Sequence, residues 1–345
     1  MWAGVLTNPW GDRATQHFFT LTPAHILDAV ERAGFRCTGR CLALNSMENR
    51  VYEVEIEVED PAKIKSPSDR FVIVKFYRPG RWTWDQIQDE HDFLFDLVDA
   101  DIPVIAPFQK DDGHSIYEDE HLGLMYTVFP KMGGRSPDEL DDEACERVGR
   151  LLARLHAVGA LKRAEHRIKL NTNTYGVSNL RWLIDSGKIP LEYRGRYQSA
   201  VETICKTSEP WFSSAACQRI HGDCHLGNLL WGAAGPFWVD FDDMVMGPPV
   251  QDLWLMIPGR DEASKLTLNK TIASYETMRP FDRSTLRLIE PLRALRFVHF
   301  AAWIGKRWDD PSFQRAFPQY GSARWWADQT CDLEEQRDLI ANGQV

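Results

Sequence analysis

The sequence has 345 residues, which is long enough for two domains or lobes. Its 43% hydrophobic and 26% charged residues are typical of a soluble globular protein, and its net charge of -10 argues against a general nucleic-acid binder. We expect no signal peptide at residues 1–9, no membrane span, and a reducing, cytoplasmic location, because the seven cysteines form no disulfide framework.

The first part of the chain is rich in strand signals. Thr22 followed by Pro23 predicts a helix that ends at Gly34. Residues 52–59 alternate apolar and acidic side chains, which predicts a strand with one buried face. The nearly all-apolar run 71–77 predicts a buried strand. Further strands are predicted at residues 42–44, 104–108, 115–117 and 122–129, with a helix over residues 83–98.

A proline- and glycine-containing break at residues 130–134 ends this pattern. Helical periodicity follows, over residues 139–158, 193–205, 264–278 and 289–308, and we expect the last eight residues to fray. The sequence therefore predicts an α+β fold with two lobes. Residues 1–130 form a lobe with a sheet and a helix, and residues 131–345 form a larger, mainly helical lobe.

The strongest chemical signal is a polar turn between two apolar runs. Asp223 and Asn228 lie in this turn, and Asp240 ends the following apolar run. Phosphoryl transfer from a nucleotide needs a carboxylate that orients the attacking hydroxyl, and oxygen ligands that hold Mg²⁺ on the phosphates. We therefore interpret Asp223 and Asp240 as catalytic and Asn228 and Asp240 as magnesium ligands, with His221 holding the loop.

Other interpretations of this region are open. Zinc could take His221, Cys224 and His225 with Cys217, although no CxxC pair or HExxH spacing accompanies them. An acidic surface turn or a capping cluster at a strand end would explain the aspartates without chemistry. Cys224 is either a small buried filler or a redox switch.

A charged residue inside an apolar strand also needs an explanation. Lys75 is that residue, and a buried lysine requires a partner. Glu90 in the predicted helix would pair with it and aim the ammonium group at nucleotide phosphates, although Asp89 and Asp92 are alternatives and an exposed strand face is possible. Residues 45–50 would cover the phosphates, with Ser46 as a donor, but they contain no glycine.

Two later features each have both a functional and a purely structural interpretation. Asp252 begins a predicted helix and would accept backbone hydrogen bonds from the loop, or simply cap that helix. The helix at residues 289–308 is basic and aromatic, with Arg293, Arg296 and His299 among its residues. It would contact substrate or, more commonly, divide into a core face and a solvated face.

These motifs resemble a known superfamily. Residues 221–228 match the signature HGDxHxxN of the choline kinase and aminoglycoside phosphotransferase superfamily, and residues 239–242 resemble its metal-binding segment. Further blocks resemble the bacterial stress response kinase A family, over nearly the whole chain, at residues 45–52, 74–79, 247–254 and 289–294.

The resemblance implies a bilobal protein-kinase-like fold with the nucleotide between the lobes. It implies a monomeric, cytoplasmic serine/threonine protein kinase of stress survival that uses ATP and Mg²⁺ and binds neither nucleic acid nor membrane. By position, Asp223 is the proton acceptor, Ser46 and Lys75 contact ATP, and Lys75 pairs with Glu90. Phe129 to Met132 form the adenine hinge. The supporting residues are His221, His225, Asp242 and Asp252.

Two other functions remain open at this point. A small-molecule phosphotransferase of the same superfamily would use acids such as Asp242 and Asp243 to hold a cationic acceptor. A pseudokinase-like binding module would have lost one of four residues that are all present, namely Lys75, Asp223, Asn228 and Asp240. The segment 240–248 is too short for a long activation loop, so control by activation-loop phosphorylation is not expected.

Overall fold

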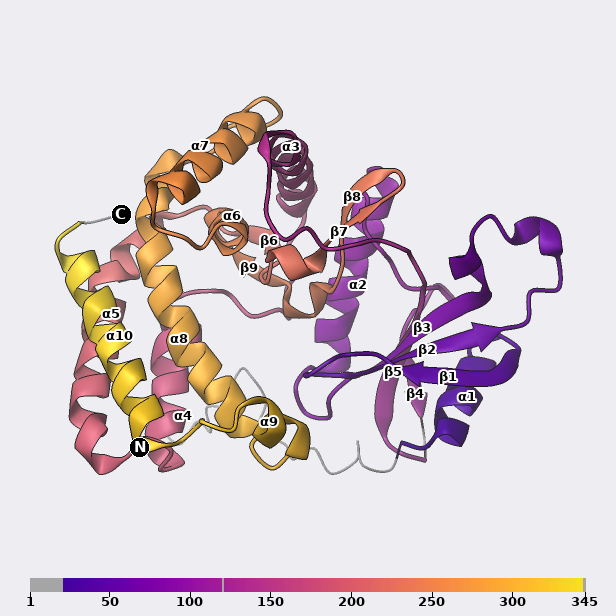
Figure 1. Ribbon diagram of the computed structural model, residues 1–345, viewed down its shortest axis with the longest axis horizontal. Helices are drawn as coiled ribbons and strands as arrows, with labels where there is room; N and C mark the ends of the chain where they lie inside the picture. The colour runs from indigo at the N-terminus through magenta and orange to yellow at the C-terminus, as the bar shows by residue number, and fades with distance from the viewer. Residues whose placement is uncertain (1–20, 120, 344–345) are drawn as a thin grey trace. The chain divides into compact units, whose positions relative to one another are not determined.

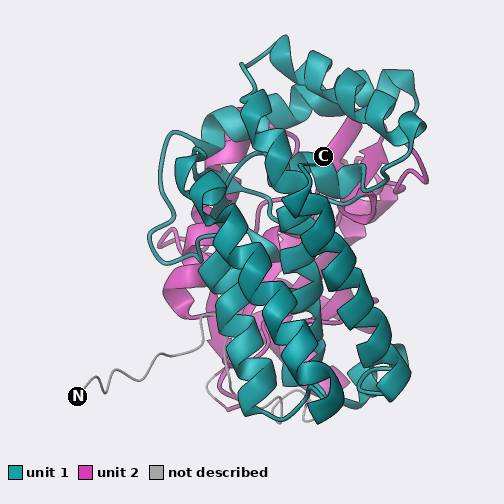
Figure 2. Cartoon of the chain, turned by 90° about the vertical axis from the view of Figure 1, so that its left-hand side faces the viewer, with its two compact units in different colours: residues 1–9, 140–225, 243–345 teal, residues 10–139, 226–242 magenta. Residues whose placement is uncertain are grey.

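The computed structural model describes residues 21–119 and 121–343, so the expectation about residues 1–9 lies outside the described residues. Within them the chain divides into two compact units (Figure 2). One unit holds residues 21–139 and 226–242, and the other holds residues 140–225 and 243–343. The segment 226–242 thus packs with the N-terminal unit although it follows much of the helical unit in sequence. The predicted lobe boundary at residue 130 stays a prediction.

The N-terminal unit is built on an antiparallel sheet (Figure 1). The strand order is β1-β2-β3-β5-β4, so that β3 is central. Helix α1 (Pro23–Arg32) packs on the sheet through Ile26, Ala29 and Val30, and α2 (Trp84–Asp99) follows β3. The strands are β1 (Cys37–Ala43), β2 (Arg50–Ile56), β3 (Phe71–Phe76), β4 (Tyr117–Asp119) and β5 (Leu124–Pro130).

The first strands differ from the prediction. Strand β1 begins at Cys37 rather than residue 42, and its polar stretch after Cys37 contains Gly39 with φ +95° beside an irregular register. An exposed edge strand with such an irregularity shows no regular alternation, so its pattern could not be recognised. Strand β2 begins at Arg50 and ends at Ile56, short of the predicted residue 59.

The strand predicted at residues 104–108 is wrong. Only Val104 makes an isolated bridge, to Trp238, and the rest of the segment is irregular. Pro103 precedes these residues and Pro107 lies among them, and proline cannot donate to a strand ladder. Trp238 ends a hairpin of the same unit, formed by β7 (Leu229–Gly232) and β8 (Gly235–Trp238).

The second unit is mainly helical, with one short strand pair, β6 (Gln218–Ile220) and β9 (Val245–Gly247). Helices α5, α8 and α10 pack along one another (Figure 1). The helices are α3 (Asp142–Gly159), α4 (Ser178–Asp185), α5 (Leu191–Ser214), α6 (Val250–Met256), α7 (Glu262–Glu276), α8 (Ile289–Lys306), α9 (Pro311–Ala316) and α10 (Ala323–Ala341). No helix among residues 21–119 and 121–343 is long and apolar enough to cross a membrane.

The C-terminal end is more ordered than predicted. Helix α10 continues to Ala341, whereas fraying was expected from residue 338. Its residues Trp326, Leu333 and Ile340 are buried. Tertiary burial against the neighbouring helices, rather than any local cap signal, therefore extends this helix.

A close helix contact in this unit provides a test. A Cβ added at Gly149 of α3 would lie 2.4 Å from the backbone oxygen of Thr271 in α7. Gly149→Ala should therefore lower the free energy of unfolding by about 1–3 kcal/mol, measured by urea titration. Gly195→Ala in α5 is the matched control, because nothing lies within 4 Å of its Cβ position. Equal stability of the two variants would contradict the close contact.

Candidate active site

A cluster of charges surrounds Lys75 in the N-terminal unit. The Lys75 Nζ atom lies 2.9 Å from Asp242 Oδ1, 3.6 Å from Asp240 Oδ1 and 3.8 Å from Glu90 Oε1. Burial alone would lower the pKa of Lys75, but the carboxylates, foremost Asp242, raise its pKa well above the ordinary value. The lysine therefore stays charged, and the interpretation as an exposed strand residue is wrong, since its side chain is 8% exposed.

The structure brings Lys75 and Glu90 together, as expected. Glu90 is the acidic residue of α2 that faces the lysine, with a side chain only 1% exposed, whereas Asp92 is exposed and accepts a hydrogen bond from Gln88. The closest partner of Lys75 is nevertheless Asp242, at 2.9 Å. Asp242 was expected only as a supporting residue, and its contact with Lys75 could not be predicted from spacing.

Two buried arginines hold the turn that contains Ser46. The Arg78 N–H donates to Asn49 Oδ1 at 3.1 Å, and Arg78 Nε donates to the Glu48 carbonyl at 2.8 Å. Arg81 Nη1 lies 2.6 Å from Glu48 Oε2, and Arg81 Nε lies 3.6 Å from Asp242 Oδ2. Sequence reasoning missed both arginines, although a basic Arg-Pro-Gly-Arg run directly after a buried strand was a usable signal.

Asn228 and Asp240 flank the hairpin of β7 and β8. The Val239 N–H donates to the Asn228 carbonyl at 3.0 Å, which holds the two flanks beside each other. Asp240 has φ 60°, a left-handed conformation that is uncommon outside glycine, and its side chain is 59% exposed. Phe241 packs on Phe93 of α2, with ring centroids 5.9 Å apart, and so fixes the segment that follows.

This donor set fits magnesium better than zinc. One carboxylate and one amide oxygen suit Mg²⁺, which keeps several waters and takes few protein ligands. Among residues 21–119 and 121–343, no group of three or more His, Cys, Asp or Glu side chains is arranged to hold a metal ion. The zinc interpretation therefore has no support in the described part of the chain.

In the helical unit, Asp252 holds the loop at residues 221–223. Its carboxylate accepts hydrogen bonds from the backbone N–H groups of His221 and Gly222, both at 2.9 Å, and lies 3.0 Å from His156 Nε2. Asp252 and His156 are fully buried. The expected hydrogen bonds to the loop are present, and the helix-capping alternative is not needed. His156 was missed, because a histidine within the apolar face of α3 carries no distinctive signal.

Gly222 permits the turn itself. It has φ +86°, and an added Cβ would lie 2.1 Å from the Asp243 carbonyl oxygen. The Gln251 side chain donates to the Gly222 carbonyl at 2.9 Å. The Asp223 N–H donates to His221 Nδ1 at 3.3 Å, which agrees with the expectation that His221 holds the loop.

Asp223 lies between two cationic or potentially cationic side chains. Arg296 Nη1 of α8 is 2.9 Å from Asp223 Oδ1, and His225 Nε2 is 3.4 Å from Asp223 Oδ2. Burial would raise the pKa of Asp223, but the hydrogen bond from His225 and the charge of Arg296 lower it well below the usual range. The carboxylate therefore remains ionised at physiological pH.

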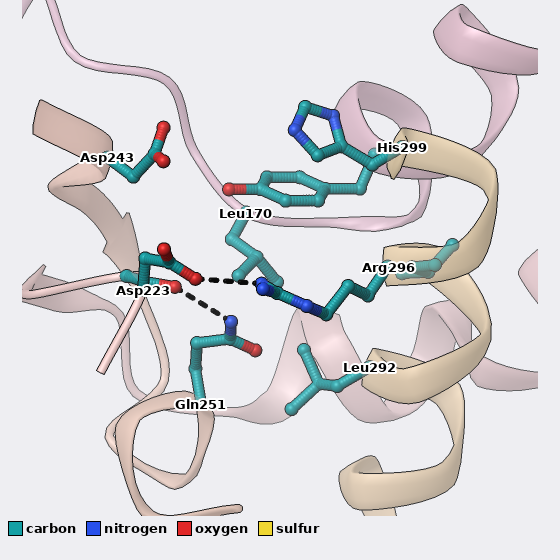
Figure 3. Close-up of a pocket in the computed structure, with 10 residues that line it drawn as sticks. Leu170, Asp223, Asp243, Gln251, Leu292, Arg296 and His299 are labelled. Carbon is teal, nitrogen blue, oxygen red and sulfur yellow. Dashed lines mark hydrogen bonds and ion pairs between the residues drawn. The ribbon is translucent and has the colours of Figure 1, made fainter. Parts of the chain in front are cut away.

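A small pocket opens at Asp223 within the helical unit (Figure 3). Its volume of about 30 Å³ admits only a few water-sized groups. Polar and apolar side chains share its wall, and the lining residues are Leu170, Tyr175, Gly222, Asp223, Asp243, Gln251, Leu292, Leu295, Arg296 and His299. The arrangement can orient a hydroxyl group against an ionised carboxylate.

The basic and histidine side chains of α8 and its C-cap residue Arg307 have two different kinds of surroundings. Arg293 bonds to Glu290 and to the Pro258 carbonyl, and Arg307 lies over the Trp303 ring at 5.7 Å. Arg293 and Arg307 therefore contact only the protein itself in these interactions. This agrees with the alternative in which the helix serves the fold and does not contact substrate. Arg296 and His299 instead line the pocket.

The remaining predicted residues have simpler surroundings. Phe129 lies in β5 with its ring 6.2 Å from that of His91, and Met132 follows the strand with 53% of its surface exposed.

Cys224 is fully buried, and its pKa is raised well above the ordinary value, chiefly by burial. A thiol in that state is a poor redox switch, so the structure favours the buried-filler interpretation.

Comparisons with known proteins agree on the family. The profile of the phosphotransferase enzyme family matches residues 42–289. Stress response kinase A of Escherichia coli (strain K12) is 37% identical over 324 residues, covering 94% of each chain. Serine/threonine protein kinase RdoA of Salmonella typhimurium is 36% identical over the same share of each chain. Among solved structures, amicoumacin kinase hAmiN matches with a TM-score of 0.67 at 18% identity, over 92% of this chain and 93% of that one.

The loop tether provides a second test. In Asp252→Asn, the amide group can present only one oxygen to two backbone N–H donors, and its own NH₂ group meets a donor. We expect the free energy of unfolding to fall by roughly 2–4 kcal/mol in urea titration. The control is Asp261→Asn at the N-cap of α7, where asparagine caps as well as aspartate, and stability should be unchanged. Equal stability of both variants would show that Asp252 is not a tether.

Proposed function

This chain belongs to the stress response kinase A family within the phosphotransferase enzyme family, and we propose that it phosphorylates serine and threonine hydroxyls of proteins with ATP and Mg²⁺. The general activity, phosphoryl transfer to a hydroxyl acceptor, follows from the family and from relatives named as kinases. The observation that carries the proposal is an ionised Asp223 at the wall of a small pocket, in a loop that Asp252 tethers.

The nucleotide side of the proposal rests on the N-terminal unit. Lys75 keeps its charge inside the sheet and is proposed to bind the phosphates of ATP, with Ser46 in the turn that Arg78 and Arg81 hold. The segment from Phe129 to Met132 is proposed to contact adenine. Asn228 and Asp240 would hold Mg²⁺, which neutralises charge on the phosphate oxygens when bound.

The acceptor side rests on Asp223. Because its pKa is well below the ordinary range, this carboxylate accepts a hydrogen bond from the acceptor hydroxyl without being protonated itself at neutral pH. Its main contribution would be to orient that oxygen, with proton acceptance only as the bond to phosphorus forms. Catalysis would then consist mostly of positioning and charge neutralisation.

A small-molecule acceptor is the second candidate. The solved structure that matches with a TM-score of 0.67 is named amicoumacin kinase, which supports the fold and leaves the acceptor open. However, Asp242 and Asp243 are not both available to hold a cationic acceptor. Asp242 is buried against Lys75 and Arg81, and only Asp243 lines the pocket.

The acceptor class can be tested by labelled phosphate transfer. The protein is incubated with γ-labelled ATP, Mg²⁺ and either dephosphorylated casein or a panel of small alcohols. We expect label in casein or in the protein itself, on serine or threonine. The control is the double variant Asn228→Ala, Asp240→Ala, which removes the proposed metal ligands and should transfer nothing. Rapid turnover of one small alcohol, with no label in any protein, would contradict the proposal.

The Lys75 cluster predicts an unequal dependence on its two buried acids. Asp242 lies 2.9 Å from the lysine Nζ atom, whereas Glu90 lies 3.8 Å from it, and Asp242 also contacts Arg81. Asp242→Asn should therefore raise the KM for ATP more than Glu90→Gln does, in steady-state assays at fixed acceptor.

The control for this comparison is Asp92→Asn, an exposed site on the same helix, which should leave the KM for ATP unchanged. A larger effect of Glu90→Gln than of Asp242→Asn would show that the shorter contact is not the one that orients Lys75.

A further inference from the structure

The pocket at Asp223 has two chemically different walls. Figure 3 shows Asp223 and Asp243 on one side and, on the other, Arg296 and His299 projecting from α8. Carboxylates can only accept hydrogen bonds, whereas a guanidinium group can only donate them. A group that enters this pocket therefore meets acceptors on one wall and donors on the other.

Arg296 is suited to bind something other than Asp223. Its side chain is 42% exposed, and one of its five N–H donors is used at 2.9 Å from Asp223 Oδ1. The neighbouring Arg293 differs, because Glu290 and the Pro258 carbonyl occupy it. Because this ion pair is partly exposed, with 22% of the Asp223 side chain accessible, it contributes little net free energy, and Arg296 can bind a second partner at small cost.

His299 adds a second polar group to this wall, with its ring held beside Asn179. The Asn179 amide nitrogen bonds to the Tyr175 carbonyl at 2.9 Å and lies 3.3 Å from His299 Nδ1. The same amide nitrogen also donates to the Thr174 carbonyl at 3.3 Å, so Asn179 holds one edge of the imidazole ring. The α8 wall thus consists of a permanent cation and an imidazole ring, three residues apart on one helix face.

Entry of an acceptor hydroxyl creates a requirement at this wall. Asp223 must present an oxygen to the hydroxyl, and Arg296 then shares this carboxylate with the acceptor, because a carboxylate can accept several hydrogen bonds at once. A guanidinium whose counter-charge is shared with a substrate that excludes water is less completely neutralised. An acceptor with its own negative charge meets this requirement, whereas an ammonium group would be repelled by Arg296.

We propose that Arg296, assisted by His299, selects acceptors that carry an anionic group beside the hydroxyl to be phosphorylated. For a protein substrate, this means a serine or threonine flanked by acidic residues. The inference rests on the proposed role of Asp223 as the residue that orients the acceptor. It concerns the charge of the acceptor and is independent of whether that acceptor is a protein.

The test uses acceptors matched in shape and different in charge. Three serine peptides of equal length carry Glu, Gln or Lys on both sides of the serine. Three small alcohols form a parallel set, namely glycerate, glycerol and 3-amino-1,2-propanediol. The kcat/KM of each acceptor is measured for wild type, Arg296→Gln, Arg296→Glu and the matched control Arg324→Gln, whose side chain is 92% exposed on α10.

Wild type and Arg324→Gln should prefer the anionic member over the cationic member of the same set by about 10- to 100-fold. Arg296→Gln should remove most of this ratio, and Arg296→Glu should invert it. The ratio is the readout, because a general loss of activity from disturbing Asp223 would lower all acceptors together. A wild-type preference for cationic acceptors, or an unchanged ratio in Arg296→Gln, would overturn the inference.

A binding measurement separates this inference from the proposed function. Calorimetric titration of the Glu and Lys peptides and of glycerate needs no phosphoryl transfer. Preferential binding of the anionic ligands that Arg296→Gln abolishes supports the inference even if no peptide is phosphorylated. Equal binding of the Glu and Lys peptides to the wild type would overturn it, whatever the activity on casein.

Discussion

A buried carboxylate determines the geometry of the loop on which the chemistry depends. Asp252 accepts two backbone hydrogen bonds from His221 and Gly222 while it contacts His156, and the two side chains are fully buried. The N–H groups of a tight turn would otherwise be unsatisfied inside the protein. Gly222 then permits the positive φ that this turn requires, and Asp223 follows at the edge of the pocket. Asp252, which lies later in the chain, thus positions Asp223 through the backbone of the two residues before it.

The two compact units carry different parts of the machinery. Lys75, Glu90, Asn228, Asp240 and Asp242 belong to the N-terminal unit, and Asp223, Asp252 and Arg296 belong to the helical unit. The loop from residue 221 to 243 contributes to both, because the chain passes from one unit to the other after residue 225 and back after residue 242. In the N-terminal unit, alternating charges from Glu48 through Arg81 and Asp242 to Lys75 link the glycine-free turn to the lysine. This network fixes the turn and the lysine relative to each other within the N-terminal unit.

The sequence predicted much of this arrangement, and the omissions have physical causes. The α+β division, the buried strand around Lys75 and the helix that carries Glu90 all follow from hydrophobic periodicity and caps, which are local signals. The residues that were missed act through contacts distant in sequence. His156, Arg81 and the pairing of Arg296 with Asp223 depend on which helix lies beside which loop, and periodicity does not contain that information. At residues 104–108 a local signal gave a wrong result. The β-branched residues favoured a strand there, although Pro103 and Pro107 oppose one.

The central claim is that Asp223 serves the acceptor and leaves nucleotide binding to the other unit. The measurement that tests it most directly is a paired assay of Asp223→Asn, with calorimetric ATP affinity and single-turnover transfer determined on one preparation. The account predicts an ATP affinity equal to that of the wild type and a transfer rate lower by about 10²- to 10⁴-fold. Transfer at the wild-type rate, or loss of ATP binding together with transfer, would contradict it.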